Sequence, residues 1–393
     1  MKIIKNGVTV DIAPYVEYAE QCLLNQRIYK VNTVDHVVHL AAYIAWQRVG
    51  GIIAVQSPLL SPEQIASLDQ RLDQTEVANA IVFHTSGTTN IPKLVIHQKR
   101  QMDEAVVTAT NAMDWGTDTV FLNLIPAFTM GFWNFVVAAG VHYDAEIVLA
   151  TKETIVQDMQ YPCNQIVLVP GLVDMYRANQ TDIDFSNFKS VFVGSSQMLE
   201  RHAQYLFDHG AKSVSNCYGT TEVGPPLLYH TSTEMNPFVD CLQLKSVGNY
   251  EVKLVNNELW IKGTPLCSNY QDMAHEGEWI RTGDLWEQHG DLIRFVGRTN
   301  EVIKVNGFQC SMLMVDRIAE ENANLGESMA VIRNTRGVEW IELFYTRKDA
   351  VIDKAAIKAI YAAKTDSNSM PRRFTYIEKL PKNGLNKKMR HAL

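Results

Sequence analysis

The chain has 393 residues, of which 46% are apolar and 20% charged, as in an ordinary globular protein of two or three domains. The formal net charge of −7 argues against nucleic-acid binding, and no segment has the ~18 uncharged apolar residues of a membrane span. The six cysteines include no Cys-x-x-Cys pair, so we expect neither a zinc site nor disulfides, and a cytoplasmic location without a signal peptide.

Apolar residues at helical spacing predict a helix over residues 35–48, capped by Asp35, and the segment 49–55 predicts a short buried strand. Further strands are predicted where apolar residues cluster between polar stretches. Each of these strands is followed by a helical or loop stretch. An example is the predicted helix over 198–210, which is closed by Gly210. The predicted strands cover 78–86, 120–128, 145–151, 164–171 and 189–196. Strands that alternate with helices predict an α/β fold with a largely parallel sheet, in which ligands bind beyond the carboxyl ends of the strands.

The pattern changes near residue 244. Residues 245–263 alternate strand and turn, and the "VNNEL" sequence predicts a hairpin. After "GR" at 297–298 a smaller unit with a ββα pattern follows, and it ends in a basic tail.

The segment "FHTSGTTNIPKLV" at 83–95 contains a run of hydroxyl and glycine residues followed by Lys93. Such residues are poor helix formers, but their N–H groups and hydroxyls can converge on an anion beside a lysine. We therefore weigh a phosphate-binding loop against an ordinary surface turn.

Four later motifs contain candidate site residues. In "NCYGTTEVGPP" at 216–226, Thr and Glu222 could serve a phosphate-bound Mg²⁺, and the alternative is a simple helix cap. In "EWIRTGDLW" at 278–286, Asp284 could accept the two hydroxyls of a ribose, and the alternative is a plain turn aspartate. The others are Arg298 in "FVGRTNEVIKVNGFQCS" and the lysine-rich loop "LPKNGLNKKMR" at 380–390.

Taken together and in order, these motifs resemble those of the adenylate-forming (AMP-binding) enzyme superfamily. That superfamily comprises acyl- and aryl-CoA synthetases, nonribosomal adenylation domains and luciferases. The matching stretches are "TSGTTNIPKL", "YGTTE", "TGD", "GRTNEVIKVNG" and "PKNGLNK", and order and spacing agree from about residue 36 to the end.

The resemblance implies a large domain over residues 1–297, with mainly parallel sheets, flanking helices and a small barrel-like β subdomain. It also implies a small, mobile α+β lid domain over residues 298–393. The implied reaction is attack of a carboxylate on the α-phosphate of ATP, assisted by Mg²⁺, followed by transfer of the acyl group to CoA or a carrier-protein phosphopantetheine. The lid domain would rotate between the two steps.

The resemblance also implies a role for individual residues. Lys387, Glu222 and Thr221 would be catalytic, with Glu222 also holding the metal ion. Asn300 would lie at the hinge, and residues 304–308, with Lys304 and Gly307, would form the thiol tunnel. ATP or AMP would be bound by Thr85, Ser86, Gly87, Thr88, Thr89, Lys93, Gly194, Ser195, Ser196, Asn216, Tyr218, Gly219, Asp284 and Arg298.

Several positions depart from the family pattern. Asn90, Leu94 and Asn386 stand where the family has glycine, and Asn300 stands at the usual hinge aspartate. None of these changes removes a charged group that takes part in the chemistry, so we expect activity. The region before the loop at 85–89 is several tens of residues shorter than usual, which would open the substrate pocket or a homodimer surface.

The segment "IPAFTMGFWN" lacks the aspartate with which relatives bind an α-amino group, so an α-amino acid is disfavoured. The resemblance predicts a mostly apolar pocket suited to an aryl or medium-chain acyl carboxylate, although apolar residues at such positions are more often plain core. Its residues would be Phe128, Thr129, Met130, Phe132, Val193 and Gly219. Two alternatives to a CoA ligase stay open: a stand-alone adenylation enzyme that loads a carrier protein, and a nucleotide-binding pseudoenzyme.

Overall fold

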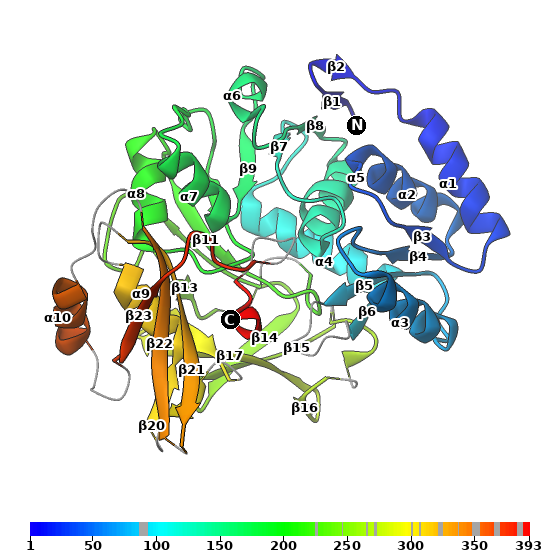
Figure 1. Cartoon of the computed structure of the whole chain (residues 1–393). Helices are drawn as coiled ribbons and strands as arrows, with labels where there is room; N and C mark the ends of the chain where they lie inside the picture. Colours follow the sequence, from blue (N-terminus) through cyan, green and yellow to red (C-terminus); the bar gives the residue numbers. More distant parts are fainter. Residues whose placement is uncertain are drawn as a thin grey trace. The chain divides into compact units, whose positions relative to one another are not determined.

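The structure is a computed structural model (Figure 1), and it describes residues 1–85, 93–224, 227–245, 247–264, 266–270, 273–299, 302–305, 308–320, 325–336, 338–347, 354–364, 370–382 and 388–393. This part of the chain divides into two compact units. Unit 1 comprises Met1–Lys253, Trp260–Arg281 and His289–Ile293, and unit 2 comprises Leu254–Leu259, Thr282–Gln288 and Arg294–Leu393. The domain boundary expected between residues 297 and 298 stays a prediction.

The main sheet of unit 1 has eight strands in the order β12-β11-β10-β9-β7-β8-β1-β2. The neighbouring pairs from β11 to β1 are parallel, whereas β12 and β2 are antiparallel edge strands. The strands are β1 (Ile3–Lys5), β2 (Val8–Thr9), β7 (Val120–Asn123), β8 (Glu146–Leu149), β9 (Gln165–Leu168), β10 (Val191–Val193), β11 (Val214–Tyr218) and β12 (Leu228–Ser232). The predicted α/β fold with largely parallel strands is confirmed.

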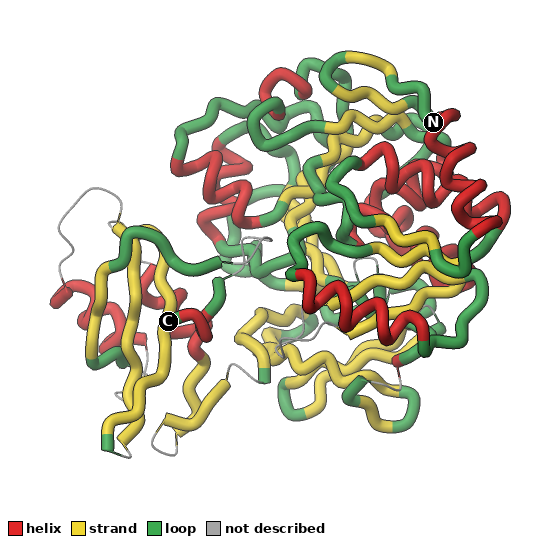
Figure 2. The backbone as a smooth tube through the Cα atoms, turned by 45° about the vertical axis from the view of Figure 1, so that its right-hand side comes forward, coloured by secondary structure: helices red, strands yellow, loops and turns green. Residues whose placement is uncertain are grey.

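Unit 1 contains a second sheet with the order β3-β4-β5-β6. Its first three strands are parallel, and β6 returns antiparallel to β5. The strands are β3 (Tyr29–Val31), β4 (Ile52–Val55), β5 (Ala80–Thr85) and β6 (Lys93–Gln98). Figure 2 shows the helices of unit 1 flanking the strands of both sheets.

Two helices of unit 1 begin at side-chain caps. Asp35 accepts a hydrogen bond from the backbone N–H of Val37 (3.1 Å) and so caps α2, as the sequence predicts. Ser61 and Gln64 form a capping box at the start of α3. The helices are α1 (Ala13–Asn25), α2 (His36–Val49), α3 (Pro62–Asp73), α4 (Lys99–Met113), the π-helix η1 (Phe132–Ala138), α5 (Ala139–Tyr143), α6 (Ile155–Asp158), α7 (Pro170–Ala178) and α8 (Glu200–Asp208).

One strand is shorter than its apolar pattern predicts. The sequence predicts a strand over 120–128, but β7 ends at Asn123. The buried Asn123 amide accepts a hydrogen bond from the Ile125 backbone N–H (3.1 Å) and donates to its carbonyl oxygen (3.3 Å). This local turn takes the backbone groups that a longer strand would use for pairing.

Two buried clusters form the core of unit 1. One surrounds Trp46 and Trp133 between the helices and the second sheet, and the other lies between the main sheet and helices α7 and α8. Within the first cluster, the fully buried His39 bonds the Thr33 carbonyl oxygen through Nε2 (2.9 Å) and accepts the Trp133 indole N–H at Nδ1 (3.2 Å).

Among the described residues no helix is both long and apolar enough to cross a membrane.

A third sheet has the order β13-β18-β17-β15-β14, with β16 paired to β17. Its strands are β13 (Leu242–Gln243), β14 (Tyr250–Val255), β15 (Glu258–Gly263), β16 (His275–Glu276), β17 (Trp279–His289) and β18 (Leu292–Arg298). Asn256 and Asn257, which join β14 to β15, both have positive φ (51° and 65°). Positive φ at both central residues is typical of the tight type I′ hairpin, so the "VNNEL" prediction is confirmed.

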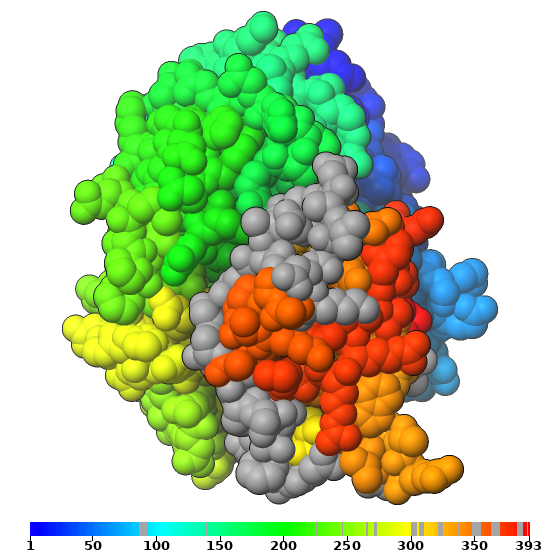
Figure 3. Space-filling model, turned by 60° about the vertical axis from the view of Figure 1, so that its left-hand side comes forward, coloured from blue at the N-terminus to red at the C-terminus, as the bar shows by residue number. Residues whose placement is uncertain are grey.

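The rest of unit 2 begins with the predicted ββα arrangement. Its elements are β19 (Val302–Val305), β20 (Phe308–Ser311), α9 (Met312–Glu320), β21 (Leu325–Thr335), β22 (Val338–Arg347), α10 (Lys354–Lys364), β23 (Arg373–Tyr376) and the short η3 (Arg390–Ala392). Strands β21 and β22 are antiparallel, and β23 is parallel to β22. Figure 3 turns the orange-to-red surface of these later elements towards the viewer.

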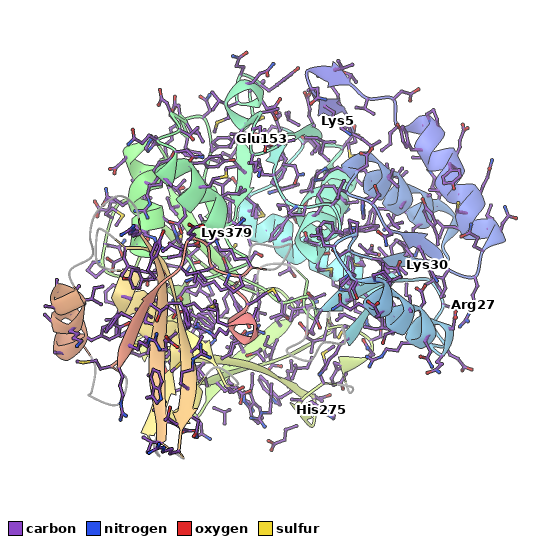
Figure 4. The ribbon with its side chains drawn as sticks, viewed as in Figure 1. Lys5, Arg27, Lys30, Glu153, His275 and Lys379 are labelled. Atoms are coloured by element: carbon purple, nitrogen blue, oxygen red, sulfur yellow. The ribbon has the colours of Figure 1, made fainter. Side chains whose placement is uncertain are left out.

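Ion pairs tie the last residues of the chain to α9. Arg390 contacts the buried Asp316 carboxylate (2.6 Å), and Lys388 contacts Glu320 (2.7 Å). By contrast, the pairs that Lys5, Arg27 and Lys30 make in unit 1 are solvent-exposed, and such pairs contribute little to stability (Figure 4).

We predict that the protein loses stability as the pH falls from about 6.5 towards 4, beyond the effect of its carboxylates. Burial lowers the pKa of His39, and also that of His84 and His97, to about 4. The unfolded chain, with histidine pKa values near ~6.5, therefore takes up these protons first. Each histidine should lower the free energy of unfolding by about 1.4 kcal/mol per pH unit in this range.

Urea unfolding between pH 7 and pH 4.5 measures this dependence. The His39→Gln variant should show a slope smaller than that of the wild type by about 1.4 kcal/mol per pH unit. An unchanged slope in that variant would contradict the prediction.

Candidate active site

The candidate site residues of unit 1 follow the carboxyl ends of parallel strands. Strands β7, β10 and β11 of the main sheet lead directly into residues 124–131, 194–196 and 219–224. Because these strands are parallel members of one sheet, the three segments lie along the same edge. The structure thus brings together motifs that are almost a hundred residues apart in the sequence.

The segment after β10 turns sharply beside β11. The Gly194 N–H donates to the Leu168 carbonyl oxygen (3.1 Å), and a Cβ at this position would lie 2.6 Å from the Cys217 Sγ atom. Only glycine fits at so short a distance. Ser195 then has a positive φ of 71°, and the side chains of Ser195 and Ser196 are exposed. Two hydroxyls and nearby backbone are therefore accessible where the resemblance places adenine.

Asn216 and Tyr218 lie on β11 beside this segment. Asn216 is buried and donates its amide N–H to the carbonyl oxygens of Asp240 (2.8 Å) and Cys241 (3.2 Å). These hydrogen bonds give Asn216 a structural role, because they hold the backbone at residues 240–241 against β11. Tyr218 is half-buried and Gly219 is exposed at the strand end. Their nucleotide contacts stay predictions.

The turn that carries Thr221 and Glu222 is held through its backbone. Every carbonyl oxygen from residue 220 to residue 223 accepts a hydrogen bond from a different group. The donors are the Gly224 N–H to Thr220 (2.8 Å), His97 Nε2 to Thr221 (2.8 Å), the Cys267 N–H to Glu222 (2.9 Å) and the Tyr250 hydroxyl to Val223 (2.6 Å). The backbone is thus fixed by protein contacts, while the Thr221 and Glu222 side chains remain half-buried and accessible.

His97 is the most informative of these donors. It is fully buried on β6, and burial lowers its pKa to about 4, so the ring is neutral at physiological pH. Because Nε2 faces a carbonyl oxygen, the proton of the neutral ring must be on Nε2. The same strand begins at Lys93, which is exposed and pairs with Thr85 across the β5–β6 hairpin. Strand β6 therefore links the residues that flank the predicted phosphate loop to the Thr221–Glu222 turn.

The sequence analysis did not single out His97, Tyr250 or the Cys267 backbone. A histidine in the otherwise apolar strand "KLVIH" is a weak signal of a buried hydrogen bond. Tyr250 and Cys267 have no local sequence signal, because their partners come from distant parts of the chain.

The predicted substrate pocket is divided between two parts of the core. Met130 and Phe132 are buried in the cluster around Trp133, whereas Val193 is buried in the cluster under α7 and α8. Phe132 packs edge-on against the His36 ring (centroids 5.0 Å apart). The Thr129 hydroxyl donates to the Pro126 carbonyl oxygen (2.8 Å), and Phe128 is half-buried. Their roles in a pocket stay predictions.

Within unit 2, the structure brings Asp284 and Arg298 together. Asp284 lies on β17 and is buried, and the Arg298 Nε atom at the end of β18 contacts its Oδ1 atom at 2.7 Å. The backbone of β17 needs glycine just before Asp284, since Gly283 has a φ of +71° and its N–H donates to Glu258 (3.0 Å). A buried carboxylate held by a guanidinium is a rigid acceptor for paired hydroxyls.

Several predicted residues lie outside the part that the structure describes. These are Ser86, Gly87, Thr88, Thr89, Asn90, Asn300, Gly307, Asn386 and Lys387, together with the side chain of Lys304. Among the described residues, no three His, Cys, Asp or Glu side chains form a group that could bind a metal ion. Mg²⁺ usually needs only one or two protein carboxylates when phosphates supply the other ligands, so Glu222 alone fits a nucleotide-bound ion.

We predict that the hydrogen bond from His97 to Thr221 stabilises the turn. The His97→Leu variant should lower the free energy of unfolding by about 1–3 kcal/mol beyond the packing change, because a buried carbonyl oxygen loses its donor. His97→Gln places an amide N–H at a similar reach and should recover most of the loss. Urea unfolding at pH 7 measures both variants, and equal losses for Leu and Gln would disprove this role.

Comparisons with known proteins agree with this geometry. The model of the family described as "AMP-binding enzyme" matches residues 69–265, half of the chain. A 4-coumarate-CoA ligase 1 from Narcissus pseudonarcissus is 24% identical over 92% of this chain and 74% of that protein. Tyrocidine synthase 2 from Brevibacillus parabrevis is 22% identical over 80% of this chain but only 10% of its own length. The chain is thus much shorter than some curated relatives.

Solved structures match the fold over nearly the whole chain. The o-succinylbenzoate coenzyme A synthetase MenE from Bacillus subtilis, in complex with ATP and magnesium ion, superimposes with a TM-score of 0.84. It is 15% identical, and the match covers 100% of this chain and 96% of that one. The amide bond synthetase McbA from Marinactinospora thermotolerans gives a TM-score of 0.82 at 14% identity over 99% of this chain and 95% of its own. From its family match, its motifs and its fold, the chain is a member of the AMP-binding enzyme family of adenylate-forming ligases.

Proposed function

We propose that this protein activates a carboxylic acid with ATP, releasing pyrophosphate, and then transfers the acyl group from the adenylate to CoA. The observation that carries the proposal is the Thr221–Glu222 turn at the carboxyl edge of the main sheet. Its four carbonyl oxygens are occupied by protein donors, so two half-buried polar side chains are carried on a fixed backbone. That arrangement suits a group that must hold a phosphate and its metal ion in one position.

The first step joins two anions, so positive charge and N–H donors must offset their repulsion. A carboxylate oxygen attacks the α-phosphorus, the bond from that phosphorus to the bridging oxygen breaks, and pyrophosphate leaves with the electron pair. Thr221 would hold an α-phosphate oxygen, and Lys93, beside the 85–89 loop, would hold the leaving phosphates. Mg²⁺ on Glu222, when bound, would neutralise part of the phosphate charge.

Asp284 and Arg298 would bind the ribose of ATP. The buried carboxylate can accept a hydrogen bond from each ribose hydroxyl, and Arg298 holds it in place at 2.7 Å. The Arg298 side chain is half-exposed, whereas the carboxylate that it contacts is buried. Gly194, Ser195, Ser196 and Tyr218 would line the adenine.

The second step needs a thiol to attack the acyl carbon and displace AMP. We assign Lys387 to the first step, where its charge would bridge the carboxylate and the α-phosphate, and Lys304 and Gly307 to the thiol tunnel of the second. The relatives whose names mention coenzyme A, such as the Narcissus ligase and MenE, support CoA as the acceptor. Their names mention 4-coumarate and o-succinylbenzoate, which supports an aryl carboxylate over a medium-chain acyl group.

A second candidate is an adenylation enzyme that loads a carrier protein. The match to tyrocidine synthase 2, over a tenth of that protein, favours it. A nucleotide-binding pseudoenzyme is the third candidate, because Leu94 replaces glycine beside the phosphate loop. Leu94 is half-buried opposite His84, and its carbonyl oxygen accepts the Asn269 amide N–H (3.0 Å). The side chain is thus accommodated within the sheet, which favours the active enzyme. A cytoplasmic location and a homodimer remain part of the proposal.

We expect pyrophosphate release from Mg²⁺-ATP to depend on one class of acid in a panel of aryl, short, medium and long carboxylates. Addition of CoA should then accelerate turnover and yield an acyl-CoA product detectable by mass spectrometry. Acceleration only by a holo-carrier protein would favour the second candidate. Absence of pyrophosphate release with every acid of the panel, although the protein still binds ATP, would overturn the enzyme assignment.

We also expect Lys387→Ala to lower acid-dependent pyrophosphate release by about 100-fold or more, because the developing negative charge loses its counter-charge. ATP affinity, measured by calorimetry, should change little. Lys379→Ala is the matched control, since Lys379 is an exposed lysine in the same C-terminal region (Figure 4). Equal effects of the two variants would show that Lys387 has no special role.

A further inference from the structure

Asn134 is a buried polar residue that the proposed mechanism does not use. It lies in the π-helix η1, all of whose residues are buried, and it is itself 0% exposed. Among the residues that the structure describes, neither its Oδ1 nor its Nδ2 atom has a hydrogen-bond partner. Asn123, a comparable buried amide at the end of β7, uses both atoms. Short π-helical segments occur frequently at functional sites.

The Asn134 side chain points at the turn that carries Thr221 and Glu222. A Cβ placed on Gly224 would lie 2.4 Å from the Asn134 Nδ2 atom and 3.1 Å from the Met130 Cε atom. Gly224 also has a φ of +91°, so the close approach of this turn depends on glycine. The amide therefore lies against Gly224 of the candidate catalytic turn. In the sequence it is four residues, about one helical turn, after Met130 of the predicted pocket.

A buried amide without partners costs free energy, and an apolar side chain of the same shape would avoid that cost. The Oδ1 atom of Asn134 lacks a donor, and its Nδ2 atom lacks an acceptor. A hydroxyl can supply both, because it accepts from Nδ2 and donates to Oδ1. Met130, with its flexible unbranched side chain, is the neighbour best able to make room for an incoming group.

We propose that Asn134 is a specificity-determining residue that binds a hydroxyl group on the acyl or aryl part of the carboxylic acid. The inference rests on the proposed function, since it assigns the substrate of that same site. It identifies the substrate class as hydroxylated carboxylic acids, in which the hydroxyl is remote from the carboxylate that attacks ATP.

Pairs of acids that differ only in one remote hydroxyl test the inference. Suitable probes are benzoate with 4-hydroxybenzoate, cinnamate with 4-hydroxycinnamate, and octanoate with 8-hydroxyoctanoate. For at least one pair, the wild type should favour the hydroxylated acid in kcat/KM for pyrophosphate release by about 10- to 100-fold. Asn134→Leu, of similar shape, should bring that ratio to about 1 by losing activity with the hydroxylated acid.

Asn123→Leu is the matched control. It removes a buried amide of the same region whose hydrogen bonds are satisfied, so it should lower the unfolding midpoint and leave the hydroxyl preference unchanged. Asn134→Leu should keep or raise the unfolding midpoint without substrate. A hydroxyl preference that survives in Asn134→Leu, or no preference in the wild type, would overturn the inference while leaving the proposed function intact.

Absence of pyrophosphate release with every acid would instead defeat the proposed function. Calorimetric binding of the same acid pairs then decides on Asn134 by itself. Tighter binding of a hydroxylated acid that is lost in Asn134→Leu would support the inference, and equal binding of both acids would overturn it.

Discussion

The structure depends on a constraint of parallel sheets. The side chains that bind a ligand come from the loops at the carboxyl edge of the sheet, and the backbone of these loops must be held in place by other parts of the protein. In unit 1 the anchors are backbone hydrogen bonds. The carbonyl oxygens of residues 220–223 accept hydrogen bonds from the Gly224 N–H of the same turn and from three groups elsewhere in the chain: a histidine, a tyrosine and the Cys267 N–H. A turn held in this way cannot move without breaking several hydrogen bonds, so the backbone that carries Thr221 and Glu222 is held in place.

Much of the fold follows from local sequence. Helix α2 begins at its Asp35 cap, the Asn256–Asn257 hairpin has the positive φ values that asparagine tolerates, and the central strands coincide with the apolar runs. The strands are nevertheless shorter than predicted, as β9 and β10 also show, and in β7 the cause is visible, because Asn123 ends it after four residues although apolar residues continue. An apolar pattern shows that residues are buried, but a single side-chain amide can decide how the backbone runs between them.

The candidate site could be predicted less completely. The order of the motifs led to Glu222, Asp284 and Arg298 as candidates, which stay predictions, and the structure pairs the last two. The sequence could not identify His97, Tyr250 or Asn134. His97 and Tyr250 matter through partners 124 and 27 residues away, and Asn134 stands out by the lack of a partner among the described residues. For Phe132 and Val193, burial in two different clusters shows why residue type alone does not separate a pocket wall from the core.

The division of the chain into units has a consequence for dissecting the protein into fragments. Unit 2 is discontinuous, since residues 254–259 and 282–288 belong to it together with the C-terminal hundred residues. A fragment cut between residues 297 and 298 would retain the buried Asp284 but lose Arg298, and so would separate the two members of this ion pair. Removal of one partner from such a pair is strongly destabilising. A cut at the boundary of the sequence motifs therefore does not coincide with the division between the two compact units.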